Sequence, residues 1–284
     1  YFIHHVASAI QPTTIIAHIA DDTHGLVDRL FPEPLGEDGR AEEPEPTDPA
    51  PGQPTEIRAD VSGYLESVDT EGLMRAAGEC DLRVRMEQVV GDFVPRGACI
   101  AMVWRESELD GHTCKRVRRG FSLGPTRTLQ QDPEFGVLQI AAIAVKALSP
   151  SVNDPSTAII CIHYLVPLLR QMGTRALPSR YRRDGAGRLR VIAAGTDFAR
   201  LAGIAFDPIR RYGAESAGVM SALLDAIGRI GEAATNPGRR ATLRHHARHV
   251  VAAAERGIAD PEDRGRVAEQ ARLVGDQVVV LVEA

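Results

Sequence analysis

The sequence predicts an α+β protein in which a small β-rich unit precedes a larger helical domain. Short runs of alternating apolar and polar residues, separated by turn residues, fill positions 57–104. After position 128, apolar residues recur instead at helical spacing. A proline-rich stretch at 32–56 separates both regions from an N-terminal helix. The 284 residues are enough for about two domains with real cores.

The first element is a helix over residues 13–31, with Pro12 suited to its first turn. Its apolar residues fall on one stripe: Ile15, Ile16, Ile19, Leu26, Val27 and Leu30. We treat residues 1–31 as a juxtamembrane amphipathic helix. The stripe needs a surface that buries it, either a second copy or the helical domain. We prefer self-association and therefore predict a homo-oligomer.

Residues 32–56 are predicted to be a disordered, acidic tether. Seven of these 25 residues are proline, and almost none is apolar. The segment has eight acidic residues against Arg40 alone, a net −7, so the rest of the chain has net +2 although the whole has −5. A segment with so little apolar surface cannot repay the entropy cost of ordering.

Residues 57–128 are predicted to form a β-rich, barrel-sandwich-like unit. Strands are expected over 57–69, 82–89 and 98–104, with a short helix over 70–81. Two short strands around the turn "GDFVPRG" resemble half of a lipoyl-like domain. Such a carrier needs a lysine at its hairpin tip, and none occurs between Ile57 and Trp104. We therefore expect no biotin, no lipoate and no other cofactor.

Residues 129–284 are predicted to be mainly helical. Four Asp-Pro steps fit an N-cap carboxylate followed by proline at the first helical position: Asp132, Asp154, Asp207 and Asp260. Thr196 is a further candidate cap. A short strand is expected in "RLRVIAA", residues 188–194.

Several function classes lack support in the sequence. The four cysteines have no zinc or disulfide spacing, which favours a reducing compartment. No run approaches the roughly 18 apolar residues of a spanning helix. No GxGxxG, Walker or GxSxG pattern occurs. The arginines between Arg175 and Arg190 have Tyr181 as the single aromatic among them, and the chain is acidic overall, which argues against nucleic acid.

The titratable clusters also have simpler explanations. Asp132 and Asp154 could form an acid/base pair, but capping already accounts for both, so we assign no catalytic residue. His245 and His249 have the spacing of metal ligands on a helix. Arg244 and Arg248 would repel a cation there. We prefer a solvated basic helix face and predict no metal site.

The stretch "QDPEFGVLQIAAIAVKALSPSVNDPSTA" contains the candidate ligand site. Asp132, Gln139, Lys146 and Asn153 recur every seven residues, which gives a helix in this stretch one thin polar line and predicts burial nearly all round. A helical hairpin whose few polar groups satisfy one another is the simpler alternative. Lysine is costly to bury without an anion. We therefore hypothesise a polar pocket for a small anionic ligand or a partner subunit, lined by Arg127, Gln139, Lys146, Asn153 and His163.

A family resemblance runs over nearly the whole chain. The motifs "YFIHHVASAIQ", "DDTHGLVDRLFP", "GDFVPRG", "FDPIRRYGA" and the long stretch above resemble, in the same order, the bacterial predicted membrane proteins called domain of unknown function 2254. The resemblance implies a cytoplasmic portion attached to the bacterial inner membrane through a missing N-terminal transmembrane region. It implies no activity. We expect a non-catalytic module for assembly, gating or ligand sensing; the alternative is an enzyme with a polar site between the helical and β-rich units.

Overall fold

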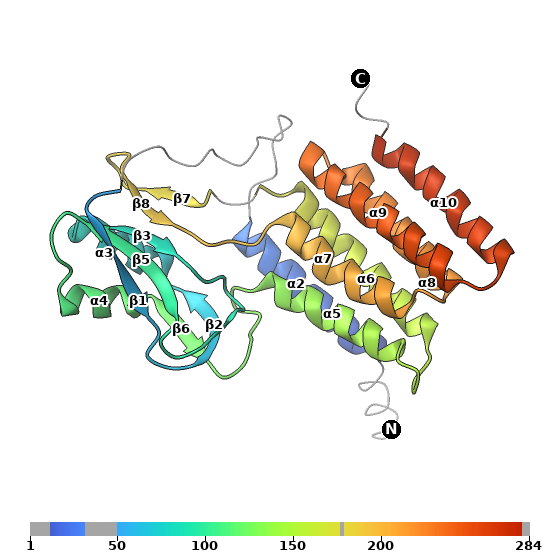
Figure 1. Ribbon diagram of the computed structural model, residues 1–284, viewed down its shortest axis with the longest axis horizontal. Helices are drawn as coiled ribbons and strands as arrows, with labels where there is room; N and C mark the ends of the chain where they lie inside the picture. Colours follow the sequence, from blue (N-terminus) through green and yellow to red (C-terminus); the bar gives the residue numbers. More distant parts are fainter. Residues whose placement is uncertain (1–11, 32–49, 177–178, 280–284) are drawn as a thin grey trace. The chain divides into compact units, whose positions relative to one another are not determined.

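The computed structural model describes residues 12–31, 50–176 and 179–279. Within these residues the chain has nine helices and eight strands, so the predicted α+β class is confirmed. The chain divides into two compact units, which Figure 1 shows. The helical unit comprises described residues 12–31, 136–176 and 197–279, and the β-rich unit comprises 50–135 and 179–196.

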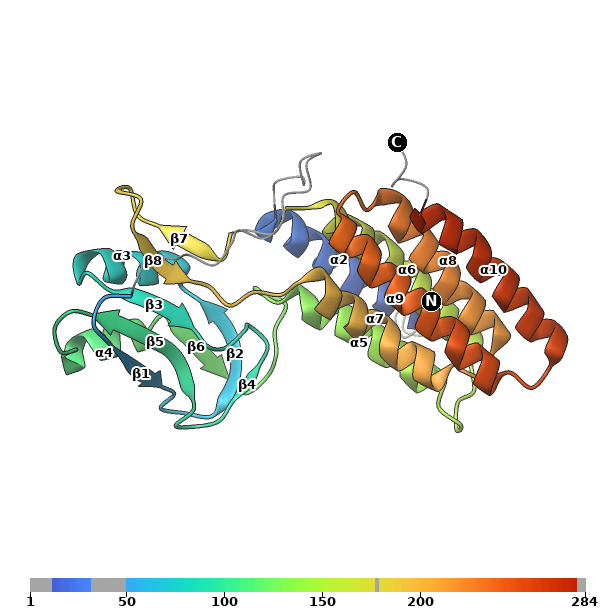
Figure 2. The same ribbon diagram turned by 45° about the horizontal axis from the view of Figure 1, so that its top comes forward.

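The helical unit is built from helices that run alongside one another (Figures 1 and 2). α6 packs against α8 and α2, and α10 packs against α8 and α9. Leu165, Phe206 and Ile227 are fully buried members of one continuous apolar core. The helices are α2 (Pro12–Leu30), α5 (Pro133–Ala147, from residue 136 onward), α6 (Pro155–Thr174), α7 (Phe198–Tyr212), α8 (Ala217–Ala233), α9 (Pro237–Gly257) and α10 (Pro261–Val279).

Helix α2, predicted to dock either on a second copy or on the helical domain, belongs to the helical unit. Its residues Ile16 and Val27 are fully buried in the helical core. On its polar side, the Nε2 of Gln171 in α6 donates to Asp28 Oδ1 at 2.7 Å. Part of the apolar stripe is therefore buried by docking on the helical unit, whereas Ile15 is 45% exposed. Self-association of the chain, the occupant we preferred, stays a prediction.

Three of the four predicted Asp-Pro caps are confirmed. Asp132, Asp154 and Asp260 each accept a backbone N–H from the first turn of the helix that follows, at 2.7–3.1 Å. The prediction for Asp207 is wrong, because Asp207 and Pro208 lie inside α7. The cap of α7 is Asp197 rather than Thr196, since Asp197 accepts the Arg200 N–H at 2.6 Å.

The β-rich unit has two open sheets, one of order β1-β5-β3-β8-β7 and one of order β4-β2-β6. The predicted barrel-sandwich-like arrangement is not confirmed by this topology. Leu65, Val84 and Val103 are fully buried in its core. Its elements are β1 (Gln53–Arg58), β2 (Gly63–Val68), α3 (Thr70–Glu79), β3 (Arg83–Met86), β4 (Phe93–Val94), β5 (Cys99–Arg105), α4 (Gly111–Arg118), β6 (Phe121–Gly124), β7 (Tyr181–Arg183) and β8 (Leu189–Ile192).

The strand predicted at residues 188–194 belongs to the β-rich unit and not to the helical domain. β8 pairs in parallel with β3, with Val191 opposite Val84. Arg190 of β8 is buried and donates to Asp184 at 2.8 Å and to Asp81 at 2.7 Å. An isolated hairpin is marginally stable, so β7 and β8 gain their stability by extending a sheet formed earlier in the chain.

The tether predicted at 32–56 falls largely on residues 32–49, which lie outside the described residues. Its last four residues, 53–56, are already part of β1. Gly52 has φ +66°, and a Cβ there would overlap the carbonyl oxygen of Arg105. The first strand therefore begins earlier than predicted, directly after a turn that only glycine fits well.

Candidate functional site

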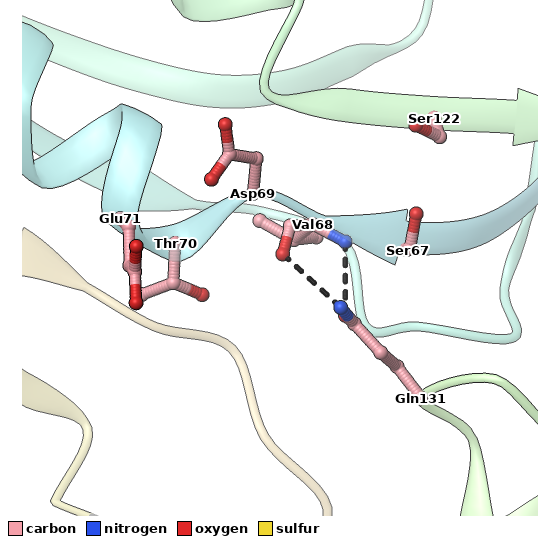
Figure 3. A pocket seen from close by; sticks show the side chains of 7 residues that line it. All are labelled: Ser67, Val68, Asp69, Thr70, Glu71, Ser122 and Gln131. Atoms are coloured by element: carbon pink, nitrogen blue, oxygen red, sulfur yellow. Dashed lines mark hydrogen bonds between the residues drawn. The ribbon is translucent and has the colours of Figure 1, made fainter.

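A polar hollow of about 410 Å³ lies in the β-rich unit, between β2, β6 and the first turn of α3 (Figure 3). Hydroxyl groups come from Ser67, Thr70 and Ser122, and carboxylates come from Asp69 and Glu71. Val68 and Gln131 complete the lining. The hollow therefore gathers hydrogen-bonding groups from three separate parts of the chain.

A β-bulge shapes the wall formed by β2 and β6. Leu65 is opposite Leu123, but the next partners are Ser67 and Ser122, so Glu66 is the extra residue. A bulge re-aims the side chains that follow it and is common beside functional sites. Here it places the two serine hydroxyls opposite one another at the hollow (Figure 3).

The junction between β2 and α3 supplies the acidic side. Asp69 follows the last residue of β2 and accepts the Gly72 N–H at 2.8 Å, which makes it the N-cap of α3. Thr70 and Glu71 lie in the first turn of that helix. Asp is favoured at the N-cap because it satisfies a free backbone donor, so this local sequence fixes the position of the acidic groups.

Gln131 forms one side of the hollow and binds the edge of β2 (Figure 3). Its Oε1 accepts the Val68 N–H at 3.0 Å, and its Nε2 donates to the Val68 carbonyl at 3.4 Å. The carboxamide thus takes the place of a neighbouring strand at this residue. Gln131 also immediately precedes Asp132, the cap of α5.

A buried ion pair joins Arg127 and Asp132, which lie on either side of Gln131 in the chain. Asp132 is 2% exposed; its Oδ2 accepts a hydrogen bond from Arg127 Nε at 2.8 Å and lies 2.7 Å from Arg127 Nη2. Burial raises the pKa of Asp132, while Arg127 and the Phe135 N–H act to lower it. Two close contacts from one guanidinium favour the carboxylate, so we describe the pair as ionic. Capping and pairing account for both Asp132 oxygens.

The polar lining groups can all form hydrogen bonds. They comprise three hydroxyls, two carboxylates and one carboxamide, with no cationic side chain among them. The hydroxyls and carboxylates suit a ligand that donates hydrogen bonds. Among the residues that the structure describes, no group of three His, Cys, Asp or Glu side chains could hold a metal ion.

The five residues predicted to line an anion pocket are not gathered around a buried lysine. Arg127 belongs to the β-rich unit, and the other four belong to the helical unit. Lys146, Asn153 and His163 are exposed. Gln139 is half-buried, and its Oε1 has no hydrogen-bond partner among the described residues.

The predicted burial of the helix nearly all round is therefore wrong. Ala142 and Lys146 lie one turn apart, and both are exposed. The sequence of α5 looks apolar partly because it contains several alanines. Alanine is tolerated on a solvent-facing side of a helix as well as in the core. Lys146 thus needs no buried anion. Anion binding by the five residues stays a prediction.

Sequence reasoning did not identify the residues of the hollow. Asp69, the cap, immediately precedes the helix predicted at 70–81 and was within reach of the capping argument. Ser122 was not, because the pairing of β2 with β6 joins segments more than 50 residues apart and β6 has only four residues.

Comparison with known proteins finds one matching family model and relatives that share the same sequence identity with the chain. The sequence model of a family described as predicted membrane protein (DUF2254) matches residues 1–229. An uncharacterized protein of Mycobacterium bovis and one of Mycobacterium tuberculosis are each 36% identical over 271 residues, which cover 94% of this chain and 51% of the relative. The chain thus spans about half the length of these curated relatives. No solved structure matches.

None of the helices in the described ranges is both long enough and apolar enough to cross a membrane. The longest, α9, has 21 residues but includes five arginines.

Proposed function

Because the chain belongs to the family of predicted membrane proteins called domain of unknown function 2254, we propose that it is the cytoplasmic portion of an integral protein of the bacterial inner membrane. In this proposal the membrane anchor lies in sequence outside these 284 residues, and the portion described here senses a small ligand without catalysing a reaction. The relatives are about twice as long as the matched segment, which leaves room for such an anchor.

The observation behind ligand sensing is the double role of Gln131. Its carboxamide forms part of the wall of the hollow and binds the backbone of Val68. The next residue caps α5, and α5 continues from the β-rich unit into the helical unit. A ligand that contacts Gln131 would change the hydrogen bonds at the start of that helix. Occupancy could then bias the helical unit through covalent continuity alone.

The chemistry of the lining defines the ligand class. Asp69 and Glu71 accept hydrogen bonds and repel anions, and the hydroxyls of Ser67 and Ser122 can donate or accept. A small amine or polyol fits these groups. The two carboxylates of this hollow, Asp69 and Glu71, would repel the anionic ligand expected from the sequence.

Calorimetric titration with two probes, putrescine as an amine and myo-inositol as a polyol, tests the proposal. We expect saturable binding of one probe to the 284-residue chain. Ser122→Leu should abolish it, because Ser122 is exposed and the larger side chain would occupy the hollow without entering the core. Ser151→Leu, at an exposed turn of the helical unit, is the matched control.

Amide hydrogen exchange supplies the second readout. Binding should slow exchange at Val68 and Phe135, whose N–H groups bond to Gln131 and Asp132. Binding without altered exchange at Phe135 would contradict sensing through α5. Chemical turnover of the bound probe would instead support the enzyme alternative.

A further inference from the structure

A second hollow, of about 460 Å³, lies within the helical unit between α7 and α9. Gly203 and Asp207 come from α7, and Thr242, His245 and His246 come from α9. These residues recur three or four positions apart, so each set lies on one helix face. The hollow is separate from the one to which we assign ligand sensing.

His246 is the most unusual side chain in this hollow. It is 5% exposed, and its Nδ1 has no hydrogen-bond partner among the described residues. The nearest carboxylate oxygen, Asp207 Oδ1, is 3.6 Å away, which is too far for a direct hydrogen bond. Buried ring nitrogens are normally satisfied. A polar group that bridges His246 and Asp207 would satisfy this one.

Asp207 can accept a hydrogen bond from such a bridging group. It does not cap a helix, since it lies in the interior of α7. Its contacts with Arg210 and Arg211 are long, at 3.3 and 3.8 Å. A carboxylate has about four lone-pair positions, so Asp207 can accept another hydrogen bond.

The two helices that form the hollow carry a net positive charge. α7 and α9 together have eight arginines and two acids, Asp207 and Glu255, a net +6. Such a field attracts anions. Asp207 opposes any anion that cannot donate a hydrogen bond to it. The combination therefore selects an anion that carries its own proton.

The geometry points to a binding site for a protonated tetrahedral oxyanion, with hydrogen phosphate as the form present at neutral pH. His246 donates to one oxygen of the ligand, and Asp207 Oδ1 accepts from its P–OH group. Neighbouring oxygens of one tetrahedral group can reach two atoms 3.6 Å apart. His245 lines the exposed side and offers a second donor.

The state of His246 agrees with this arrangement. Burial lowers its pKa, and the neighbouring His245, His249 and Arg210 lower it further, whereas Asp207 raises it. The ring is then neutral near pH 7 and carries one N–H. That single donor and the Asp207 acceptor together match an anion with one proton.

Sulfate provides the sharpest test, because it has the shape of phosphate but no proton at neutral pH. Calorimetric titration of the 284-residue chain at pH 7.5, with ionic strength held constant by chloride, should show one saturable site for inorganic phosphate. Loss of one charge-assisted hydrogen bond should make sulfate weaker by about tenfold or more. Asp207→Asn should remove that preference, because a carboxamide N–H can donate to sulfate.

Two further variants separate the site from general charge attraction. A Cβ at Gly203 would meet nothing within 4 Å, so Gly203→Leu should fill the hollow and abolish binding while circular dichroism and melting temperature stay close to wild type. His249→Gln should leave binding unchanged, since His249 contacts the His245 ring at 4.3 Å but does not line the hollow. Equal binding of phosphate and sulfate, or an unchanged preference in Asp207→Asn, would overturn the proposal.

A lipid headgroup could supply the same chemistry, because a phosphomonoester is partly protonated near its second pKa of about 6. Vesicles of phosphatidic acid in phosphatidylcholine distinguish the two sources. Sedimentation of the wild type with these vesicles, reversed by free phosphate and absent for Gly203→Leu, would identify a lipid ligand. Phosphate binding without sedimentation would identify free phosphate.

Discussion

At the scale of single residues, Gly91 is limited both by its backbone and by its surroundings. Its φ is +98°, and a Cβ there would overlap Asp132 Oδ2 and lie 2.5 Å from Arg127 Nη2. The buried ion pair that precedes α5 therefore depends on a residue without a side chain. Its N–H also bonds to the carbonyl of Leu65 in β2 at 2.8 Å, which fixes its position.

We expect Gly91→Ala to lower the free energy of unfolding by about 3 kcal/mol, through backbone strain and disturbance of the ion pair. Gly97→Ala is the matched control, because Gly97 has φ +86° but nothing within 4 Å of a Cβ. Gly97→Ala should lower the free energy of unfolding by about 1 kcal/mol, through backbone strain alone. Urea denaturation measures both, and equal costs would show that crowding of the ion pair contributes nothing.

Asp184 gives a prediction for acid stability. A hydrogen bond from Arg190 is the main cause that lowers the pKa of Asp184 from 3.8 to about 2, and Arg190 also lowers the pKa of Asp81. A carboxyl with a lowered folded-state pKa stabilises the protein above pH 3.8, and this contribution disappears as the pH falls through about 2. The β7–β8 hairpin should therefore weaken in that window.

Asp184→Asn should flatten the fall in unfolding free energy between pH 4 and pH 2, as followed by fluorescence during acid titration. Asp225→Asn is the control, because Asp225 pairs with Arg229 on an exposed helix surface. If both variants retain the wild-type slope, the Asp184–Arg190 contact does not contribute to acid stability.

At the scale of elements, α5 and α2 meet at a glycine. A Cβ on Gly136 would overlap Oγ1 of Thr23, which itself donates to the Ile19 carbonyl at 2.6 Å. Gly136→Ala should destabilise the protein by about 1–3 kcal/mol, although alanine favours a helix. Thr23→Ala removes the opposing atom, so the double variant should recover part of the loss.

A double-mutant cycle by urea denaturation measures that coupling. Gly25→Ala in α2 is the control, since nothing lies within 4 Å of a Cβ there. It should stabilise the protein by about 0.5–1 kcal/mol through helix propensity alone. Additive effects of Thr23→Ala and Gly136→Ala would contradict direct contact.

The elements also show which sequence signals were sufficient. Asp followed by Pro located the starts of α5, α6 and α10, because capping is a local interaction. The same signal failed at Asp207, where the apolar stripe of α7 continues past Pro208 and tertiary burial outweighs the lost hydrogen bond. Local patterns located β8 but not its parallel partner β3. They missed β6, which has four residues and pairs with β2 more than 50 residues earlier.

In the candidate sites, too, local sequence patterns predicted some features and missed those that depend on distant contacts. Periodicity placed Lys146 on a helix but could not tell which side of that helix faces solvent. It placed His245 and His249 on an exposed face correctly, but the adjacent His246 points inward, and its proximity to Asp207 depends on the packing of α7 against α9. Contacts between elements depend on the tertiary structure, which local sequence patterns do not reveal.

At the scale of the whole molecule, each unit has its own apolar core. We therefore expect two transitions in scanning calorimetry rather than one. Gly91→Ala should lower the transition of the β-rich unit, and Gly136→Ala should lower that of the helical unit. A single transition shifted equally by both variants would show that the units unfold together.

The interleaving of the two units has a consequence for synthesis on the ribosome. α2 docks on α6, and His24 and Gln171, which meet there at 2.6 Å, are 147 residues apart. At about 5–20 residues per second, α2 waits roughly 7–30 seconds for that partner. Most of the β-rich unit emerges during this delay, but β3 cannot pair with β8 until still later. The apolar face of α2 is thus exposed early, when a chaperone or a nearby membrane surface could cover it.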